Sequence, residues 1–96
     1  MKKIVDIELL DSFKMICVFE NGERKILDLT KTLDKSHRYA EKVFSEEIFR
    51  KTKIGSMGQI YWEGIAEIVN LDGHSVPCEY DMSPEFVYLN SSKISL

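Results

Sequence analysis

The stretch "CEYDMSPEF", residues 78 to 86, places a thiol, three carboxylates and a proline within nine positions. Two kinds of chemistry use such groups: zinc binding, and nucleophilic catalysis by a cysteine beside a histidine. His74, just upstream of Cys78, would serve either one. A structural zinc site needs four ligands, usually with a C-x-x-C or H-x-x-x-H pair, and this chain has neither pair. We therefore predict no metal, no cofactor and no catalytic residue, and keep a nucleophile made of Cys78 with His74 or His37 as an alternative.

The same stretch is also typical of the start of a helix. Ser83 is a favoured N-cap, Pro84 suits the first helical position, and the Glu85 carboxylate complements the positive end of the helix dipole. We favour this structural interpretation, in which the buried side of the helix is formed by Phe86, Val87 and Leu89. The other cysteine, Cys17, is predicted to be a small buried side chain, and both thiols are expected to be reduced.

The N-terminal third is predicted to form a three-stranded antiparallel meander. In "FKMICVFENGERKILDL", Asn21-Gly22 separates two runs rich in β-forming residues, which predicts a two-residue type I′ hairpin pairing 13–20 with 23–29 and Cys17 with Ile26. Before it, "VDIEL" alternates apolar and acidic residues, as a strand with one wet face does. That alternation turns Val5, Ile7 and Leu9 inward.

Helical spacing begins at Thr30. The apolar residues Leu33, Ala40 and Phe44 predict one helix lying on the sheet, and Ser45 predicts the start of a short second helix. Strand patterns return at "QIYW", and Asp72-Gly73 predicts a tight turn between "IAEIV" and "SVP". We expect a single α+β domain spanning 1–96, an antiparallel β-sheet with short helices packed on one side. A chain of this length, 44% hydrophobic, can bury one modest core.

Charge is divided unevenly along the chain. Residues 1–53 carry a net charge of +2, and residues 54–96 carry −5, with no lysine or arginine from 54 to 92. Such an acidic segment favours a basic protein partner over nucleic acid, which needs a concentrated basic surface. The alternative is that the two halves neutralise each other. The candidate partner-binding residues are Glu63, Glu67, Asp72, Glu79, Asp81 and the neighbouring Trp62.

A second candidate surface is basic. Lys31, Lys35, Arg38 and Lys42 recur at intervals of four, three and four, which places them along one face of the predicted helix. Such a stripe suits phosphates or an acidic partner. Asp34 and Glu46 stand four residues from Arg38 and Lys42, so part of the stripe is neutralised locally. We favour the interpretation that it is a solvated face.

The location suggested by the sequence is the cytoplasm. Met1, Lys2 and Lys3 resemble the charged start of a signal peptide, but Asp6, Glu8 and Asp11 interrupt the apolar run that would have to follow. No stretch approaches the roughly 20 apolar residues of a membrane-spanning helix. We therefore expect no membrane association.

Four segments in order, "VFENGERKILDL", "SEEIFRKTKI", "GQIYWEG" and "YDMSPEFVY", carry a family resemblance. Together they resemble small bacterial proteins of the DUF2442 family, a domain of unknown function. The matching positions are Asp28, Leu29, Phe49, Trp62, Asp81, Pro84, Glu85 and Tyr88. The resemblance implies an α+β fold and no known activity, and some relatives look like partners of small toxin-like proteins.

These observations lead to a functional hypothesis. We expect a non-enzymatic protein-interaction module, antitoxin-like, that binds a small basic protein or a second copy of itself. The alternative is a small-molecule or metal-binding domain, or an enzyme that uses the carboxylates near Trp62.

Overall fold

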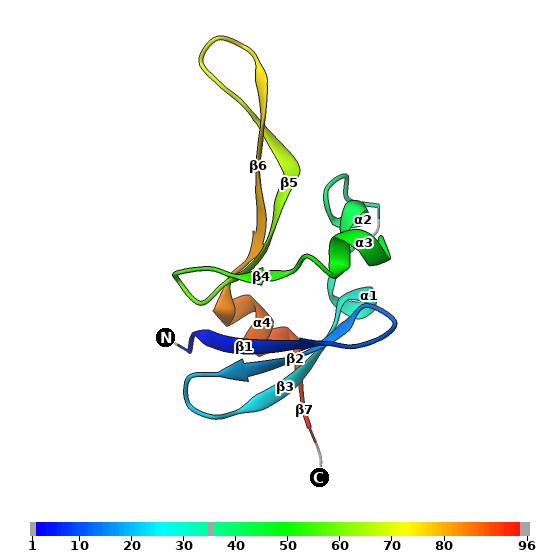
Figure 1. Cartoon of the computed structure of the whole chain (residues 1–96), viewed down its shortest axis with the longest axis vertical. Helices are drawn as coiled ribbons and strands as arrows, with labels where there is room; N and C mark the ends of the chain where they lie inside the picture. The colour runs from blue at the N-terminus through cyan, green and yellow to red at the C-terminus, as the bar shows by residue number, and fades with distance from the viewer. Residues whose placement is uncertain (1, 35, 95–96) are drawn as a thin grey trace.

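The computed structural model describes residues 2–34 and 36–94 (Figure 1). The strands are β1 (Ile4–Leu9), β2 (Lys14–Phe19), β3 (Arg24–Asp28), β4 (Lys53–Ile54), β5 (Ile60–Val69), β6 (Ser75–Met82) and β7 (Ser92–Lys93), and the helices are α1 (Leu29–Thr32), α2 (Ala40–Val43), α3 (Glu46–Phe49) and α4 (Pro84–Asn90). One antiparallel sheet has the order β1-β2-β3-β7, and a second has the order β4-β5-β6. The predicted α+β fold and its N-terminal meander are confirmed. The second sheet was not anticipated as a separate unit.

The β2–β3 hairpin forms where predicted, but its register differs by one residue. Cys17 lies opposite Lys25, and Ile16 lies opposite Ile26. The Phe19 amide donates to the carbonyl of Glu23, which leaves a three-residue loop in which Gly22 has φ +88° and Asn21 does not adopt a positive φ. A type I′ turn would need a positive φ at both central residues. The chain instead uses the three-residue loop with glycine in the left-handed position.

The first strand contains an irregularity that overturns the prediction for Val5. Ile4 pairs with Phe19 and Asp6 pairs with Val18, so Val5 is an extra residue in a β-bulge. Because of the bulge, the side chains at the start of the strand point to the opposite faces from those predicted. Ile4 is buried, and Val5 is 56% exposed. Ile7 and Leu9, beyond the bulge, are half-buried against the core as predicted.

The single helix predicted from Thr30 is two short helices, α1 and α2. The Asp34 carboxylate accepts hydrogen bonds from the amide (2.9 Å) and the hydroxyl (2.7 Å) of Ser36. Such a local turn competes with helical hydrogen bonding, so the helix ends before Asp34. The predicted inward orientation of the three apolar residues is nevertheless confirmed, because Ala40 is buried and Leu33 and Phe44 pack against the core. The N-cap at Ser45 begins α3, whose Phe49 is fully buried.

The core lies between the two sheets and the helices. It joins Met15, Cys17 and Leu27 from the first sheet to Ile60 and Trp62 of the second. The helices contribute the buried side chains Val43, Phe49 and Val87.

Helix α4 begins as predicted, with the Ser83 hydroxyl accepting from the Phe86 amide at 3.2 Å. Its buried side differs, because Phe86 is 40% and Leu89 80% exposed, while Val87 is buried. Tyr88 fixes the helix to the meander: its ring meets Phe19 edge-on at 5.2 Å, and the Lys25 ammonium lies 4.0 Å from the ring centroid.

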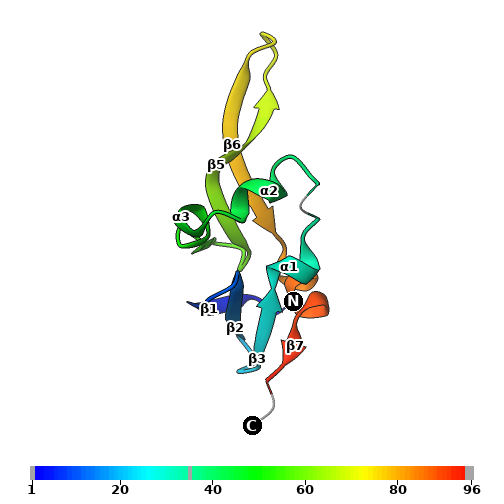
Figure 2. The same cartoon turned by 90° about the vertical axis from the view of Figure 1, so that its right-hand side faces the viewer.

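The hairpin of β5 and β6 extends away from the rest of the molecule (Figures 1 and 2). With the hairpin included, the described chain measures 52 × 27 × 19 Å. Its turn forms at the predicted Asp72-Gly73. The Asn70 amide donates to the carbonyl of His74, and Gly73 has φ +80°, so this loop is of the same three-residue kind as the loop at Gly22. We call residues 65–81 the ribbon.

Candidate protein-binding surface

Side chains alternate across the ribbon and give it two different faces. Along β6, burial alternates residue by residue, and residues directly opposite one another on the two strands share a face. The apolar face consists of Ala66, Ile68, Val76, Cys78 and Tyr80. The acidic face consists of Glu67, Glu79 and Asp81, together with Val69, Ser75 and Pro77.

The register therefore places Glu67, Glu79 and Asp81, three of the five predicted carboxylates, on one face. Glu79 and Asp81 are exposed, and in the described part of the chain no ion pair joins either one to a cation. Asp72 is exposed at the tip, in the turn between the two strands. Among the described residues, Glu79, Asp81 and Asp72 are thus the predicted carboxylates without an ion-pair partner.

Glu63 and Glu67, the other two predicted carboxylates, are paired with cations of the first half of the chain. Glu63 accepts from the Lys53 ammonium at 3.1 Å, and the Glu67 carboxylate lies 3.6 Å from the Arg38 guanidinium. Glu67 also accepts from the Ser75 hydroxyl at 2.7 Å. Among residues 2–34 and 36–94, the halves thus neutralise each other at these two positions, and exposed pairs of this kind contribute little to stability.

Trp62 does not belong to the exposed surface. It is 1% exposed, and its indole nitrogen donates to the Thr52 hydroxyl at 2.7 Å. The prediction that Trp62 belongs to the partner-binding surface is corrected on this ground, because a side chain buried to this extent cannot take part in the acidic face. Next to it, Gly64 has φ +72° where three residues, 63 to 65, lie opposite Glu79 alone. This irregularity in β5 marks the base of the ribbon.

Each edge of the ribbon carries features that disfavour the addition of a further strand. Asn70 and His74 form a hydrogen-bonded pair, and such pairs alternate with non-hydrogen-bonded ones along an antiparallel ladder. Pro77 therefore lies in a non-hydrogen-bonded pair, and its backbone faces the outer edge of β6. Because proline has no N–H, it cannot donate to a further strand there. On the β5 edge, the Ile65 carbonyl accepts from the Lys42 ammonium at 3.1 Å, and the Glu67 carbonyl accepts from the Tyr39 hydroxyl at 3.2 Å. Side chains thus occupy positions that a neighbouring strand would use.

The predicted basic stripe does not exist as one helical face. Lys31 lies on α1 and Lys42 on α2, with Arg38 in the connection between them, and Lys35 lies outside the described residues. Arg38 and Lys42 both contact β5, as described above. Because the helix is interrupted at Asp34, Arg38 and Lys42 contact the ribbon and do not share one helical face with Lys31.

The cysteines and histidines were considered above as metal ligands or as a nucleophile and its base. Within residues 2–34 and 36–94, no group of three or more metal-binding side chains is present. Cys17 is fully buried as predicted, and burial raises the pKa of its thiol to about 12. Cys78 is half-buried on the apolar face, and His74 is exposed beside the turn.

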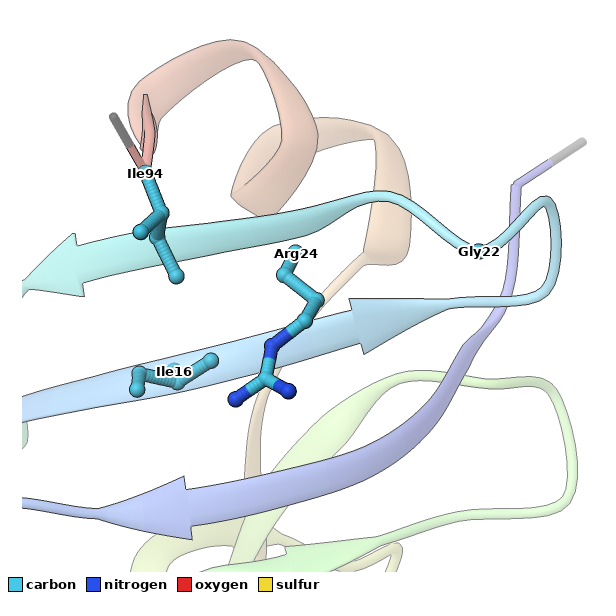
Figure 3. A pocket seen from close by; sticks show the side chains of 4 residues that line it. All are labelled: Ile16, Gly22, Arg24 and Ile94. Carbon is cyan, nitrogen blue, oxygen red and sulfur yellow. The ribbon is translucent and has the colours of Figure 1, made fainter. Parts of the chain in front are cut away.

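Among the hollows of the described surface, two of similar volume lie outside the two faces of the ribbon and bear on the predicted sites. One, of about 480 Å³, is on the first sheet, where Ile16, Arg24 and Ile94 lie around it near Gly22 (Figure 3). The other, of about 450 Å³, is a groove beside α3 whose apolar lining is Ile48, Trp62 and Ile65. Its charged rim contains the Lys53–Glu63 pair and, on α3, Glu47 near Lys51 at 3.7 Å. The first hollow contains none of the predicted site residues.

Comparisons with protein families, with curated proteins and with solved structures found no match. The resemblance to DUF2442 therefore stays a prediction. Most of its residues serve the fold: Leu29, Phe49, Trp62 and Pro84 are buried. Asp28 caps α1 by accepting from the Thr30 amide at 3.0 Å.

Sequence reasoning missed the apolar face. The alternation in "IAEIV" and "SVPCEY" predicts two faces for each strand, but which face the core covers depends on where the strands leave the body. Ile68, on the apolar face, is 57% exposed. The alternation was visible in the sequence, but how far the apolar face reaches into solvent was not.

No helix of the described part is long and apolar enough to cross a membrane.

Proposed function

We propose that this protein is a non-enzymatic interaction module whose acidic ribbon binds a small basic protein. The observation that carries the proposal is the set of unpaired carboxylates, Glu79 and Asp81 on one face and Asp72 at the tip, on a hairpin that stands away from the body. The structure supports the proposal further, because a protruding hairpin can reach into a partner without moving the core. In this proposal the chain itself acts as an antitoxin-like protein, and its partner is a small basic protein.

The electrostatics favour fast, salt-sensitive association. Carboxylates on an exposed face act mainly on the association rate, and salt screens them once the Debye length falls to about 8 Å. The same field repels the phosphates of nucleic acid. A basic protein is therefore the better fit for this face.

A charge-reversal pair with a matched control tests the proposal. Glu79→Lys with Asp81→Lys reverses two alternate strand residues on the acidic face, and Asp6→Lys with Glu8→Lys makes the same charge change on β1. Association with small basic proteins encoded beside the gene, and with duplex DNA, is measured by surface plasmon resonance at low and high salt. We expect the ribbon variant to associate about tenfold more slowly at low salt, and the β1 variant to match the wild type. Tight binding of DNA by the wild type, or equal effects of the two variants, would refute the proposal.

The groove beside α3 supports a second candidate, a small-molecule site. Its apolar floor with a few charged groups is typical of ligand pockets. Trp62 lines it and is the only tryptophan, so its fluorescence reports on occupation. Titration with a panel of metabolites, with an Ile48→Ala variant as a comparison, tests this candidate. An emission change that the variant weakens supports it, and unchanged emission across the panel counts against it.

A further inference from the structure

Two side chains at the start of α2 fasten the body of the molecule to the β5 edge of the ribbon. The Tyr39 hydroxyl donates to the Glu67 carbonyl at 3.2 Å, and the Lys42 ammonium donates to the Ile65 carbonyl at 3.1 Å. Tyr39 is half-buried, and the next residue, Ala40, is buried in the body. The buried start of α2 therefore fixes the position of Tyr39 beside the ribbon.

Arg38, the residue before Tyr39, lies at the acidic face. Its guanidinium is 3.6 Å from Glu67 Oε2, and the same oxygen accepts from the Ser75 hydroxyl at 2.7 Å. The guanidinium carbon lies 5.3 Å from the centroid of the Tyr39 ring, within the range of a cation–π contact. Tyr39 thus contacts Glu67 through its hydroxyl and orients Arg38 toward the carboxylate of the same residue through its ring.

This arrangement places a positive charge among the carboxylates of the acidic face. Glu67 lies opposite Pro77, so Glu79 is a diagonal neighbour of Glu67 on that face. The side chains of Arg38 and Glu67 are 72% and 42% exposed, so an incoming protein can reach the pair. A guanidinium binds a carboxylate most strongly through both oxygens, and Arg38 already lies beside one of the two. A cation of another protein therefore competes with Arg38 for Glu67.

We propose that Arg38 is an internal competitor of the basic partner, held at the acidic face by Tyr39, and that the partner displaces it on binding. This inference rests on the proposed function and adds a built-in control of its affinity. Before the partner binds, Arg38 neutralises part of the acidic face and lowers the attraction of that face for other cations. Exposed ion pairs are weak, so the contact lowers the affinity without closing the site.

Three variants separate the competitor from a general effect of net charge. Arg38→Gln removes the guanidinium from the acidic face. Arg50→Gln removes the same charge at the end of α3, where Arg50 pairs with Glu46 and Asp11. Tyr39→Phe leaves the net charge unchanged and removes only the hydroxyl that bonds the ribbon. Far-UV circular dichroism checks that each variant folds.

The probe is a fluorescently labelled oligolysine peptide, and its binding is measured by fluorescence anisotropy at low and at high salt. At low salt we expect Arg38→Gln to bind about threefold more tightly than the wild type, and Tyr39→Phe about twofold more tightly. Arg50→Gln should change the affinity by less than about 1.5-fold, because its charge lies away from the ribbon. High salt should remove these differences. Equal affinities of Arg38→Gln and Arg50→Gln would overturn the proposal.

The acidic face itself is tested in the same assay by Glu79→Lys with Asp81→Lys. If this double variant binds the peptide as tightly as the wild type, the acidic face is not the binding site, and both the proposed function and the competitor are refuted. If the double variant binds more weakly while Arg38→Gln and Arg50→Gln bind alike, the proposed function stands and only the competitor is refuted.

Discussion

Replacing Thr52 with valine should destabilise the protein through the buried indole of Trp62. The Thr52 hydroxyl accepts from the Trp62 nitrogen at 2.7 Å and donates to the Phe49 carbonyl at 2.6 Å. Valine has nearly the same shape but no hydroxyl, so the indole N–H stays buried without a partner. Leaving one buried donor unsatisfied costs about 1–3 kcal/mol. For a chain of this size, about 2 kcal/mol lowers Tm by about 8–16 °C.

The assay is thermal unfolding followed by circular dichroism, with Trp62 emission as a second probe. Thr52→Ser is the control, because it keeps the hydroxyl and loses one methyl group, which costs less than about 1 kcal/mol. In a Trp62→Phe background, Thr52→Val should also cost less than about 1 kcal/mol, since no indole N–H remains to be orphaned. If Thr52→Val and Thr52→Ser melt at the same temperature, the reasoning is refuted.

Two further predictions concern the β2–β3 loop. Gly22 has φ +88° with open space around its Cβ position, so Gly22→Val should cost about 1 kcal/mol or more from backbone strain, lowering the urea midpoint; an unchanged midpoint would contradict this. Hydrogen bonds from Asn21 and then from Tyr88 lower the pKa of Glu23, so the ionised carboxylate stabilises the fold above its unfolded-state pKa, and this contribution disappears as the pH falls through the lower folded-state pKa. In urea titrations from neutral pH to about pH 3, Glu23→Gln should therefore lose less stability than the wild type, and an equal loss would exclude this role for Glu23.

Local chemistry made several elements predictable from the sequence. Asn21-Gly22, Asp72-Gly73 and the cap at Ser83 each act within about four residues, and each stands where it was predicted. The register of the first hairpin was wrong because Asn-Gly is compatible with loops of two or three residues. Only the backbone angles distinguish these loops, and the choice shifts every cross-strand pair by one.

Long-range contacts account for what the sequence could not predict about the candidate site. Arg38 meets Glu67, and Lys42 meets the carbonyl of Ile65, across more than 20 residues of chain. The periodicity of the sequence does not encode such a contact. The contact depends on the helix break at Asp34, where local side-chain hydrogen bonds override a helical pattern. The acidic charge of the second half was visible in the sequence, but its division into paired and unpaired carboxylates was not.

The edges of the ribbon bear on how this protein behaves at high concentration. An exposed hairpin rich in β-branched residues is a site where strands from other chains add one after another, and the product of unlimited addition is a fibril. Pro77 removes a donor from one edge, and the side chains of Lys42 and Tyr39 occupy carbonyls on the other. Addition of a strand is thus disfavoured at these positions on both sides of the ribbon. The same features work against the first step of fibril growth when the chain is concentrated.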